Sequence, residues 1–330
     1  MPAYAAYRGG LHVVDPDDGS AVRRLADHDV ETLAVSSDRS TRLFAGTFDA
    51  GLHRSTDGGA SFERVGATDI GPDAVTAVAV SPHDPDVVWV GTEPSRIFRS
   101  VDGGETFERV EGLTAVPSAD EWSFPPRPDT HHVRWIEPSP RDPERWYVGV
   151  EAGALLVTPD GGETWLDRPP GSLRDNHTLA THPDAPDRVY SAAGDGYAES
   201  EDGGETWTHV EDGLAHGYVW GLAVDPGDPE TVIASAASGA STAHRRGEAY
   251  LYRKQGGSGG SRDQPWERLD DAGVPVGEGT YRAVLAGGRE AGELWALTNH
   301  GLHRSRDGGD SFEGVPVALP AEPARALAVV

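Results

Sequence analysis

The residues best suited to bind a ligand occupy one recurring position, at the start of seven short apolar segments. Each segment has a core similar to Leu-Ala-Val and is predicted to be a strand. Arginine suits a carboxylate or a phosphate, and tryptophan suits the face of a sugar. If the segments converge, the set predicts a site for an anion or a sugar. The seven residues are Glu31, Thr76, Arg134, His177, Trp220, Arg282 and Arg325.

Neighbouring residues extend this candidate site. His177 and Tyr281 can supply further hydrogen-bond donors, and Glu31 can orient the arginines or act as an acid–base group. The alternative is that these side chains pair with one another and plug the space. In that arrangement, Glu31 would neutralise Arg325 or Arg282 from a neighbouring segment.

Three histidines near the starts of consecutive segments, His132, His177 and His216, raise the possibility of a metal site. Converging imidazoles could hold a divalent ion with an open coordination position. These histidines do not share one equivalent position, and the chain has 13 histidines, so coincidence is the simpler explanation. We therefore expect neither a metal nor another cofactor.

Motifs for catalysis are scarce. The sequence has no nucleophile motif, phosphate-binding loop or dinucleotide fingerprint. Hydrolysis of a glycosidic bond needs two carboxyl groups at a defined separation, and Glu31 with Asp29 or Asp73 is a candidate pair. The sequence alone does not fix their spacing.

A block of the form Ser/Thr-x-Asp-Gly-Gly-x-Ser/Thr-Phe/Trp recurs five times, and it identifies the elements that must position these residues. Its aspartates are 45, 58, 42 and 105 residues apart, so the last gap should hold a degenerate block. The Asp can accept bonds from backbone amides, and the glycines permit positive φ. Because a catalytic group would not be needed five times, the block predicts a structural turn. The aspartates are Asp57, Asp102, Asp160, Asp202 and Asp307.

Four short β-rich segments accompany each block, which predicts one blade of a β-propeller per unit. Residues 3–25 supply only three strands, and residues 324–330 supply the missing first strand. The C-terminal strand would then close the ring and remove an exposed edge. The prediction is one seven-bladed domain over residues 1–330. Its blades are 3–25 with 324–330, 31–65, 74–110, 131–168, 176–210, 217–269 and 281–315.

Two segments depart from the repeat. In the blade at 217–269, a glycine-rich loop at 256–260 replaces the Asp-Gly-Gly turn. The connection at 112–130 is the longest insertion, and we expect it to cover the candidate site as a lid.

The five blocks resemble the Asp-box, or bacterial neuraminidase repeat. This repeat occurs in sialidases, sortilin-type receptor ectodomains, xyloglucan-acting glycosidases and photosystem II assembly-factor-like propellers. The resemblance covers nearly the whole chain and implies an all-β, seven-bladed propeller. Sialidases also carry an Arg-Ile-Pro segment, which this sequence lacks. The insertion-poor layout is most similar to the sortilin-type and assembly-factor-like propellers.

Two functions follow from the resemblance and the candidate site. We expect a non-catalytic binding or assembly propeller that presents an arginine-rich channel mouth to an anionic small molecule or a protein segment. The alternative is a glycoside hydrolase or lyase, similar to sialidases, that uses carboxylates at the mouth. Two carboxyl groups about 5–10 Å apart in an open pocket would favour the hydrolase.

The composition limits the partners. The chain has 28 basic and 54 acidic residues, a net charge of −26, which disfavours nucleic acids and membranes as partners. Lys254 is the only lysine, and together with the acidity it predicts a protein of a halophilic archaeon; an acidic mesophilic protein is the alternative. With no cysteine, no signal-peptide pattern and no membrane-spanning apolar run, we expect a cytoplasmic monomer.

The charge leads to a prediction about salt. Self-repulsion among the carboxylates should destabilise the fold at low ionic strength, because little screening occurs there. The melting temperature, measured by circular dichroism, should rise steadily between about 0.1 M and molar KCl. A flat or falling curve would exclude adaptation to salt.

Overall fold

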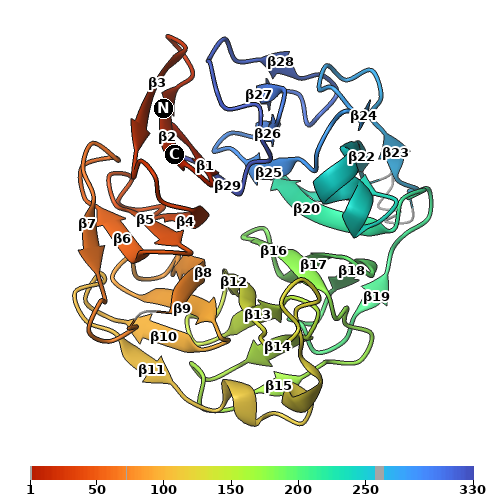
Figure 1. The fold of residues 1–330 in the computed structure, drawn as a ribbon. Coiled ribbons are helices and arrows are strands. Elements are labelled where there is room, and N and C mark those ends of the chain that lie inside the picture. Colours follow the sequence, from red (N-terminus) through yellow and green to blue (C-terminus); the bar gives the residue numbers. More distant parts are fainter. Residues whose placement is uncertain (1, 72, 257–263) are drawn as a thin grey trace.

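Seven antiparallel sheets stand around a central axis in the computed structural model, which describes residues 2–71, 73–256 and 264–330 (Figure 1). Six sheets have four strands, and the sixth along the chain has an additional short strand. The all-β, seven-bladed propeller predicted from the sequence is therefore confirmed. Of the predicted loop at 256–260, all but Gly256 lies outside the described residues.

Within each blade, the strands pair in chain order, from the inner strand beside the axis to the outer strand. The first blade joins β29 (Ala326–Val329) to β1 (Ala3–Tyr7), β2 (Gly10–Asp15) and β3 (Ser20–Arg24). The second blade contains β4 (Val30–Val35), β5 (Leu43–Thr47), β6 (Gly51–Ser55) and β7 (Glu63–Val65). The third blade contains β8 (Ala74–Val80), β9 (Val88–Glu93), β10 (Ile97–Ser100) and β11 (Glu108–Val110). The fourth blade contains β12 (Val133–Pro138), β13 (Trp146–Val150), β14 (Ala154–Thr158) and β15 (Leu166–Asp167). The fifth blade contains β16 (Asn176–His182), β17 (Ala185–Ala193), β18 (Gly196–Ser200) and β19 (Thr208–His209). The sixth blade contains β20 (Tyr218–Asp225), β21 (Asp228–Ala237), β22 (Glu248–Lys254), β23 (Glu267–Arg268) and β24 (Gly277–Glu278). The seventh blade contains β25 (Val284–Gly287), β26 (Leu294–Thr298), β27 (Gly301–Ser305) and β28 (Glu313–Gly314).

The C-terminal strand closes the ring. Strand β29 pairs antiparallel with β1, with Ala3 opposite Val329 and Ala6 opposite Ala326. The Arg325 amide extends this ladder, since it donates to the Ala6 carbonyl at 2.9 Å. The sequence prediction that the last strand completes the first blade is confirmed. The closure covers the edge of β1, which would otherwise be unpaired.

The hydrophobic core lies between adjacent blades. Strands β5 and β13 are buried along their whole length, because neighbouring sheets cover both of their faces. Between the third and fourth blades, Trp89 and Trp146 stack with ring centroids 4.6 Å apart. Each blade therefore depends on its neighbours for burial, and the ring folds as mutually supporting sheets.

The Asp-Gly-Gly turn on the third blade shows how the repeated block works. Asp102 accepts hydrogen bonds from the Thr106 amide (3.0 Å) and the Thr106 hydroxyl (2.6 Å). Gly104 has φ of 86°, a conformation that favours glycine, and a Cβ there would lie 2.8 Å from Phe44 of the preceding blade. The turn thus closes on itself and packs against the neighbouring blade.

Two insertions reach the axis. The connection at 112–130 contains the short helices η1 (Leu113–Ala115) and η2 (Ala119–Glu121). A second insertion, which the sequence did not predict, forms the π-helix η3 (Thr242–Arg246) between β21 and β22. Within the described part of the chain, no helix is long and apolar enough to span a membrane.

Ring closure gives a direct prediction. Removing residues 327–330 should expose the edge of β1 and uncover the core beside it, since these residues pair with β1 or pack on it. We expect a lower melting temperature together with aggregation, measured by circular dichroism and light scattering. A truncated chain that melts like the full chain would contradict the closure.

The turns give a prediction about pH. Hydrogen bonds from the Thr106 hydroxyl and amide lower the pKa of Asp102 to about 2. The unfolded carboxyl has a pKa near 3.9, so its stabilising effect is present above about pH 4 and is lost as the pH falls through 2. In chemical denaturation, Asp102→Asn should reduce the slope of unfolding free energy against pH between 4 and 2. Glu108→Gln, an exposed carboxylate on the same blade, should leave that slope unchanged.

Candidate functional site

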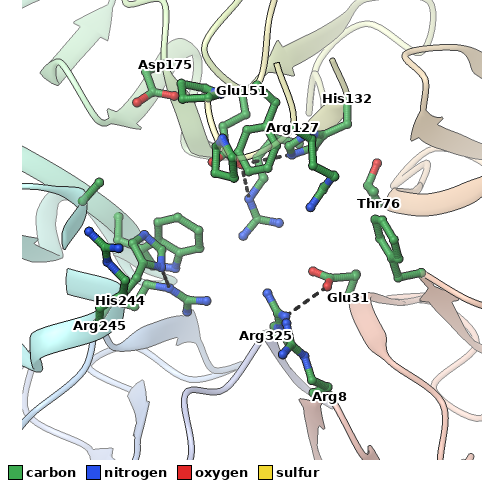
Figure 2. Close-up of a pocket in the computed structure, with 18 of the residues that line it drawn as sticks. Arg8, Glu31, Thr76, Arg127, His132, Glu151, Asp175, His244, Arg245 and Arg325 are labelled. Atoms are coloured by element: carbon green, nitrogen blue, oxygen red, sulfur yellow. Dashed lines mark hydrogen bonds and ion pairs between the residues drawn. The ribbon is translucent and has the colours of Figure 1, made fainter. Parts of the chain in front are cut away.

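A cavity of ≈ 670 Å³ opens at the end of the central channel where the inner strands begin, and all seven blades contribute to its wall. Figure 2 shows side chains converging on this space from around the ring. Six of the seven residues that the sequence placed at equivalent positions line it. These six are Glu31, Thr76, Arg134, Trp220, Arg282 and Arg325.

A β-bulge explains why one position in each blade faces the channel. In five inner strands, the pairing with the second strand skips one residue, and in every case the skipped residue is the predicted one. A bulge leaves its extra residue unpaired and re-aims its side chain. The skipped residues are Glu31, Thr76, Arg134, His177 and Trp220. Arg282 and Arg325 lie just before the strands of their own blades.

Arg282 is the most deeply placed cation in the cavity wall, with a relative exposure of 3%. Its guanidinium donates to the Ala324 carbonyl (2.8 Å) and to His244 Nδ1 (3.0 Å), and it lies 3.9 Å from the Trp220 ring centroid. None of the described carboxylates forms an ion pair with it. Burial, together with the charges of Arg134 and Arg325, lowers the pKa of Arg282 to about 9, so it remains a cation at neutral pH.

The other two arginines contact carboxylates only loosely. Arg134 lies 4.9 Å from the Trp220 ring centroid, and its Nε is 3.6 Å from Glu151 Oε2 without a hydrogen bond. Arg325 lies 3.4 Å from a Glu31 oxygen and 3.9 Å from an Asp29 oxygen. Trp220 therefore contacts both Arg134 and Arg282, and all three predicted arginines border one space, with Arg8, Arg127 and Arg245 also in its wall.

The insertion at 112–130 forms one side of the cavity through Phe124, Pro125, Pro126 and Arg127. Arg127 donates two hydrogen bonds to Glu93, at 2.7 and 2.6 Å, and its guanidinium lies 4.9 Å from the Phe48 ring. The charge of Arg127 is thus satisfied within the protein.

Two predicted residues do not line the cavity. His177 is fully buried and is not part of the cavity wall. Its Nδ1 forms a hydrogen bond with the Val219 carbonyl at 2.8 Å, and its ring packs on Trp220. Tyr281 is absent from the wall because it precedes Arg282 by one residue, and adjacent residues of extended chain face opposite sides. The expectation that both supply donors to the cavity is not met by this placement.

The three histidines considered as metal ligands do not converge as a set, since His132 and His177 both lie near Glu151 and His216 lies elsewhere. His132 lies 3.0 Å from Glu151, and His177 lies 3.7 Å from Asp175. His216 belongs to a different environment, where its ring stacks on Tyr250 with centroids 4.3 Å apart.

The predicted carboxylate pairs have different surroundings. Asp29 and Glu31 both line the cavity and both lie near Arg325. Asp73 is outside the cavity wall and pairs with Arg96.

Several wall residues were not predicted, although a signal for some of them is present. Strand residues two apart share a face, and at four of the five bulges the residue two before the bulge also lines the cavity. Asp29, His132, Asp175 and Tyr218 occupy that position and line the cavity. Glu151 follows β13, whose end lies beside the start of the inner strand.

One group at the wall is close enough to bind a common partner. An oxygen of Glu151, an oxygen of Asp175 and a ring nitrogen of His177 lie within 4.8 Å of one another. Figure 2 shows Glu151 and Asp175 on the same side of the cavity, opposite Glu31 and Arg325. The mouth therefore contains an arginine cluster and a separate carboxylate–histidine group.

The sequence matches no protein-family model and no curated protein sequence. The fold is similar to a GH74 enzyme from Niastella koreensis (TM-score 0.70, 16% identity, 93% of this chain and 50% of that chain). It is also similar to the GH74 xyloglucanase from Xanthomonas campestris (TM-score 0.67, 19% identity, 98% of this chain and 52% of that chain). A third similar structure is YCF48 bound to D1 peptide (TM-score 0.62, 17% identity, 89% of this chain and 84% of that chain).

At these identities the comparisons establish the propeller fold alone. The chain spans about half the length of the two GH74 enzymes but 84% of YCF48.

Proposed function

We propose that this protein is a non-catalytic binding or assembly propeller whose channel mouth binds an anionic group. The group would be a carboxylate or phosphate of a small molecule or of a protein segment, held by Arg134, Arg282 and Arg325. The main support for this proposal is the environment of Arg282. This buried cation lines the cavity and has no carboxylate partner among the described residues. An anion in the cavity would supply charge-assisted hydrogen bonds that the protein itself does not provide.

The contact geometry argues against the alternative, in which the polar side chains plug the channel. A satisfied pair in this mouth is Arg127 with Glu93, which share two hydrogen bonds of 2.6 and 2.7 Å. The separations of Arg325 from Glu31 (3.4 Å) and of Arg134 from Glu151 (3.6 Å) are longer. A plug would bring these groups into direct hydrogen-bonded pairs, and an open cavity would not remain.

A protein segment is a reasonable occupant. One solved propeller of similar fold is described as YCF48 bound to D1 peptide, so the fold can hold a peptide. In the present chain, the guanidinium groups offer charge to such a segment, and Phe124, Pro125 and Pro126 in the cavity wall offer apolar surface.

We further propose that the five turns are Asp-box repeats and that the acidic surface is an adaptation of a cytoplasmic protein to high salt. Five turns share one hydrogen-bond pattern, in which the Asp carboxylate binds the Ser or Thr hydroxyl four residues later. Lys254 as the only lysine and the net charge of −26 support the second point.

Calorimetric titration with citrate, inorganic phosphate and tetraglutamate tests the binding function. Arg282→Met keeps an apolar stem on Trp220, and Arg325→Gln keeps polarity; each should weaken binding about tenfold or more by removing a charge-assisted hydrogen bond. Arg268→Gln, an exposed arginine outside the cavity, is the matched control. If none of the three probes binds the folded chain, or if the two cavity variants bind like the control, the proposal is wrong.

A glycoside hydrolase is the second candidate because Glu151 and Asp175 both line the cavity and carry oxygens within 4.8 Å of one another. Retaining glycosidases hold their carboxyl pair about 5 Å apart. A screen of aryl glycosides, including sialosides, in molar KCl tests this function. Turnover that Asp175→Asn abolishes in a folded chain would support it, and no turnover of any substrate would count against it.

A further inference from the structure

We propose that Glu151, Asp175 and His177 form a binding site for one divalent transition-metal ion at the wall of the channel mouth. Two carboxylate oxygens and an imidazole nitrogen are donors that suit zinc, manganese and related ions. Their three donor atoms lie within 4.8 Å of one another, so small side-chain adjustments would bring them around one ion. The inference concerns a cation site and does not depend on the proposed anion binding.

Hydrogen bonds hold the Glu151 and Asp175 carboxylates in place. Each of these bonds uses one carboxylate oxygen and leaves the other oxygen available to bind an ion. Glu151 Oε2 lies 3.0 Å from His132 Nε2, and no described group forms a hydrogen bond with its Oε1. Asp175 Oδ1 accepts the Ala152 amide at 2.8 Å. Outer contacts of this kind orient metal-binding carboxylates in proteins.

His177 is oriented as metal-binding histidines are. Its Nδ1 lies 2.8 Å from the Val219 carbonyl, which can only accept, so Nδ1 carries the proton. In the neutral imidazole, Nε2 is therefore an acceptor, and the Tyr218 hydroxyl at 3.5 Å forms a long hydrogen bond with it. That nitrogen is buried and lies 3.7 Å from Asp175 Oδ1, so with a neutral ring two acceptors face each other. A cation would resolve this unfavourable contact.

The directions of the neighbouring hydrogen bonds are consistent with His177 Nε2 as an acceptor. The Arg282 guanidinium can only donate, so His244 accepts at Nδ1 and, as a neutral ring, carries its proton on Nε2. Burial and the charge of Arg282 lower the pKa of His244 to about 3, which keeps the ring neutral. His244 Nε2 then donates to the Tyr218 hydroxyl at 2.8 Å, and the hydroxyl proton points toward His177 Nε2, 3.5 Å away.

The site has access and an open position. Glu151 and Asp175 line the ≈ 670 Å³ cavity, so an ion could enter from the channel mouth. Three protein ligands would leave at least one coordination position for water or a bound molecule. Arg134, 3.6 Å from Glu151, reduces the negative potential, so we expect weaker binding than at a structural zinc site.

Metal titration of the full chain tests the site. The protein is treated with EDTA, desalted, and titrated calorimetrically with ZnCl₂ and with MnCl₂ at pH 7.5. We expect one ion per chain and a melting temperature that rises with metal concentration. Asp175→Asn, Glu151→Gln and His177→Ala should each weaken binding at least about tenfold, because each removes one ligand.

Two matched variants separate this site from general metal binding by an acidic protein. Asp29→Asn removes a cavity carboxylate outside the group, and His216→Ala removes a histidine elsewhere. Both should bind metal as the unaltered chain does. Circular dichroism without metal identifies any variant that fails to fold, and the isosteric Asn and Gln variants guard against that outcome. The proposal is overturned if the unaltered chain binds neither ion at 1:1 stoichiometry, or if folded ligand variants bind like the controls.

Discussion

The contact between each Asp-Gly-Gly turn and the preceding blade is the constraint on which the rest of the structure depends. In two of these turns the second glycine lies against a tyrosine ring of the preceding blade: a Cβ at Gly59 would meet Tyr4 at 3.0 Å, and one at Gly204 would meet Tyr147 at 2.7 Å. The Tyr147 hydroxyl also donates to the Gly203 carbonyl at 3.1 Å. A larger residue would separate the blades. Because the turns fix the angle between blades, they also fix where the inner strands converge.

The sixth blade satisfies the same constraint by different chemistry. It lacks the block, and Lys254 is buried at the end of β22, where its ammonium pairs with Glu199 of the fifth blade. Glu199 also accepts hydrogen bonds from Arg188. A buried ion pair of this kind contributes little net stability, but removing one partner leaves an uncompensated charge. The blade-to-blade contact is therefore retained through charge where the backbone turn is missing.

The fold and most of the mouth follow from repetition in the sequence. The repeated turn fixes the period, and the period aligns the bulge residues, so Arg134 and Arg282 could be placed together without coordinates. Tyr281 was misplaced because the alignment gives position along a strand but not the direction of the side chain. Glu151 and His244 were missed because they come from a strand end and from η3, an insertion outside the repeat. Pairing of β12 with β13 brings Glu151 beside the inner strand of its own blade, and η3 brings His244 to Arg282 of the next blade.

The arrangement of charge in the mouth favours ligand binding over self-neutralisation. Arg282 is buried, yet its contacts are the Trp220 ring, His244 and the Ala324 carbonyl, and none of the described carboxylates pairs with it. Glu151 and Asp175 are close together, yet the nearest guanidinium, that of Arg134, forms no hydrogen bond with Glu151 at Nε. Opposite charges that share a cavity with only long contacts between them are costly, and such costs persist where binding offsets them. An anion at the arginines and a cation at the carboxylates would each relieve one half of this cost, so the two sites can coexist in one channel mouth.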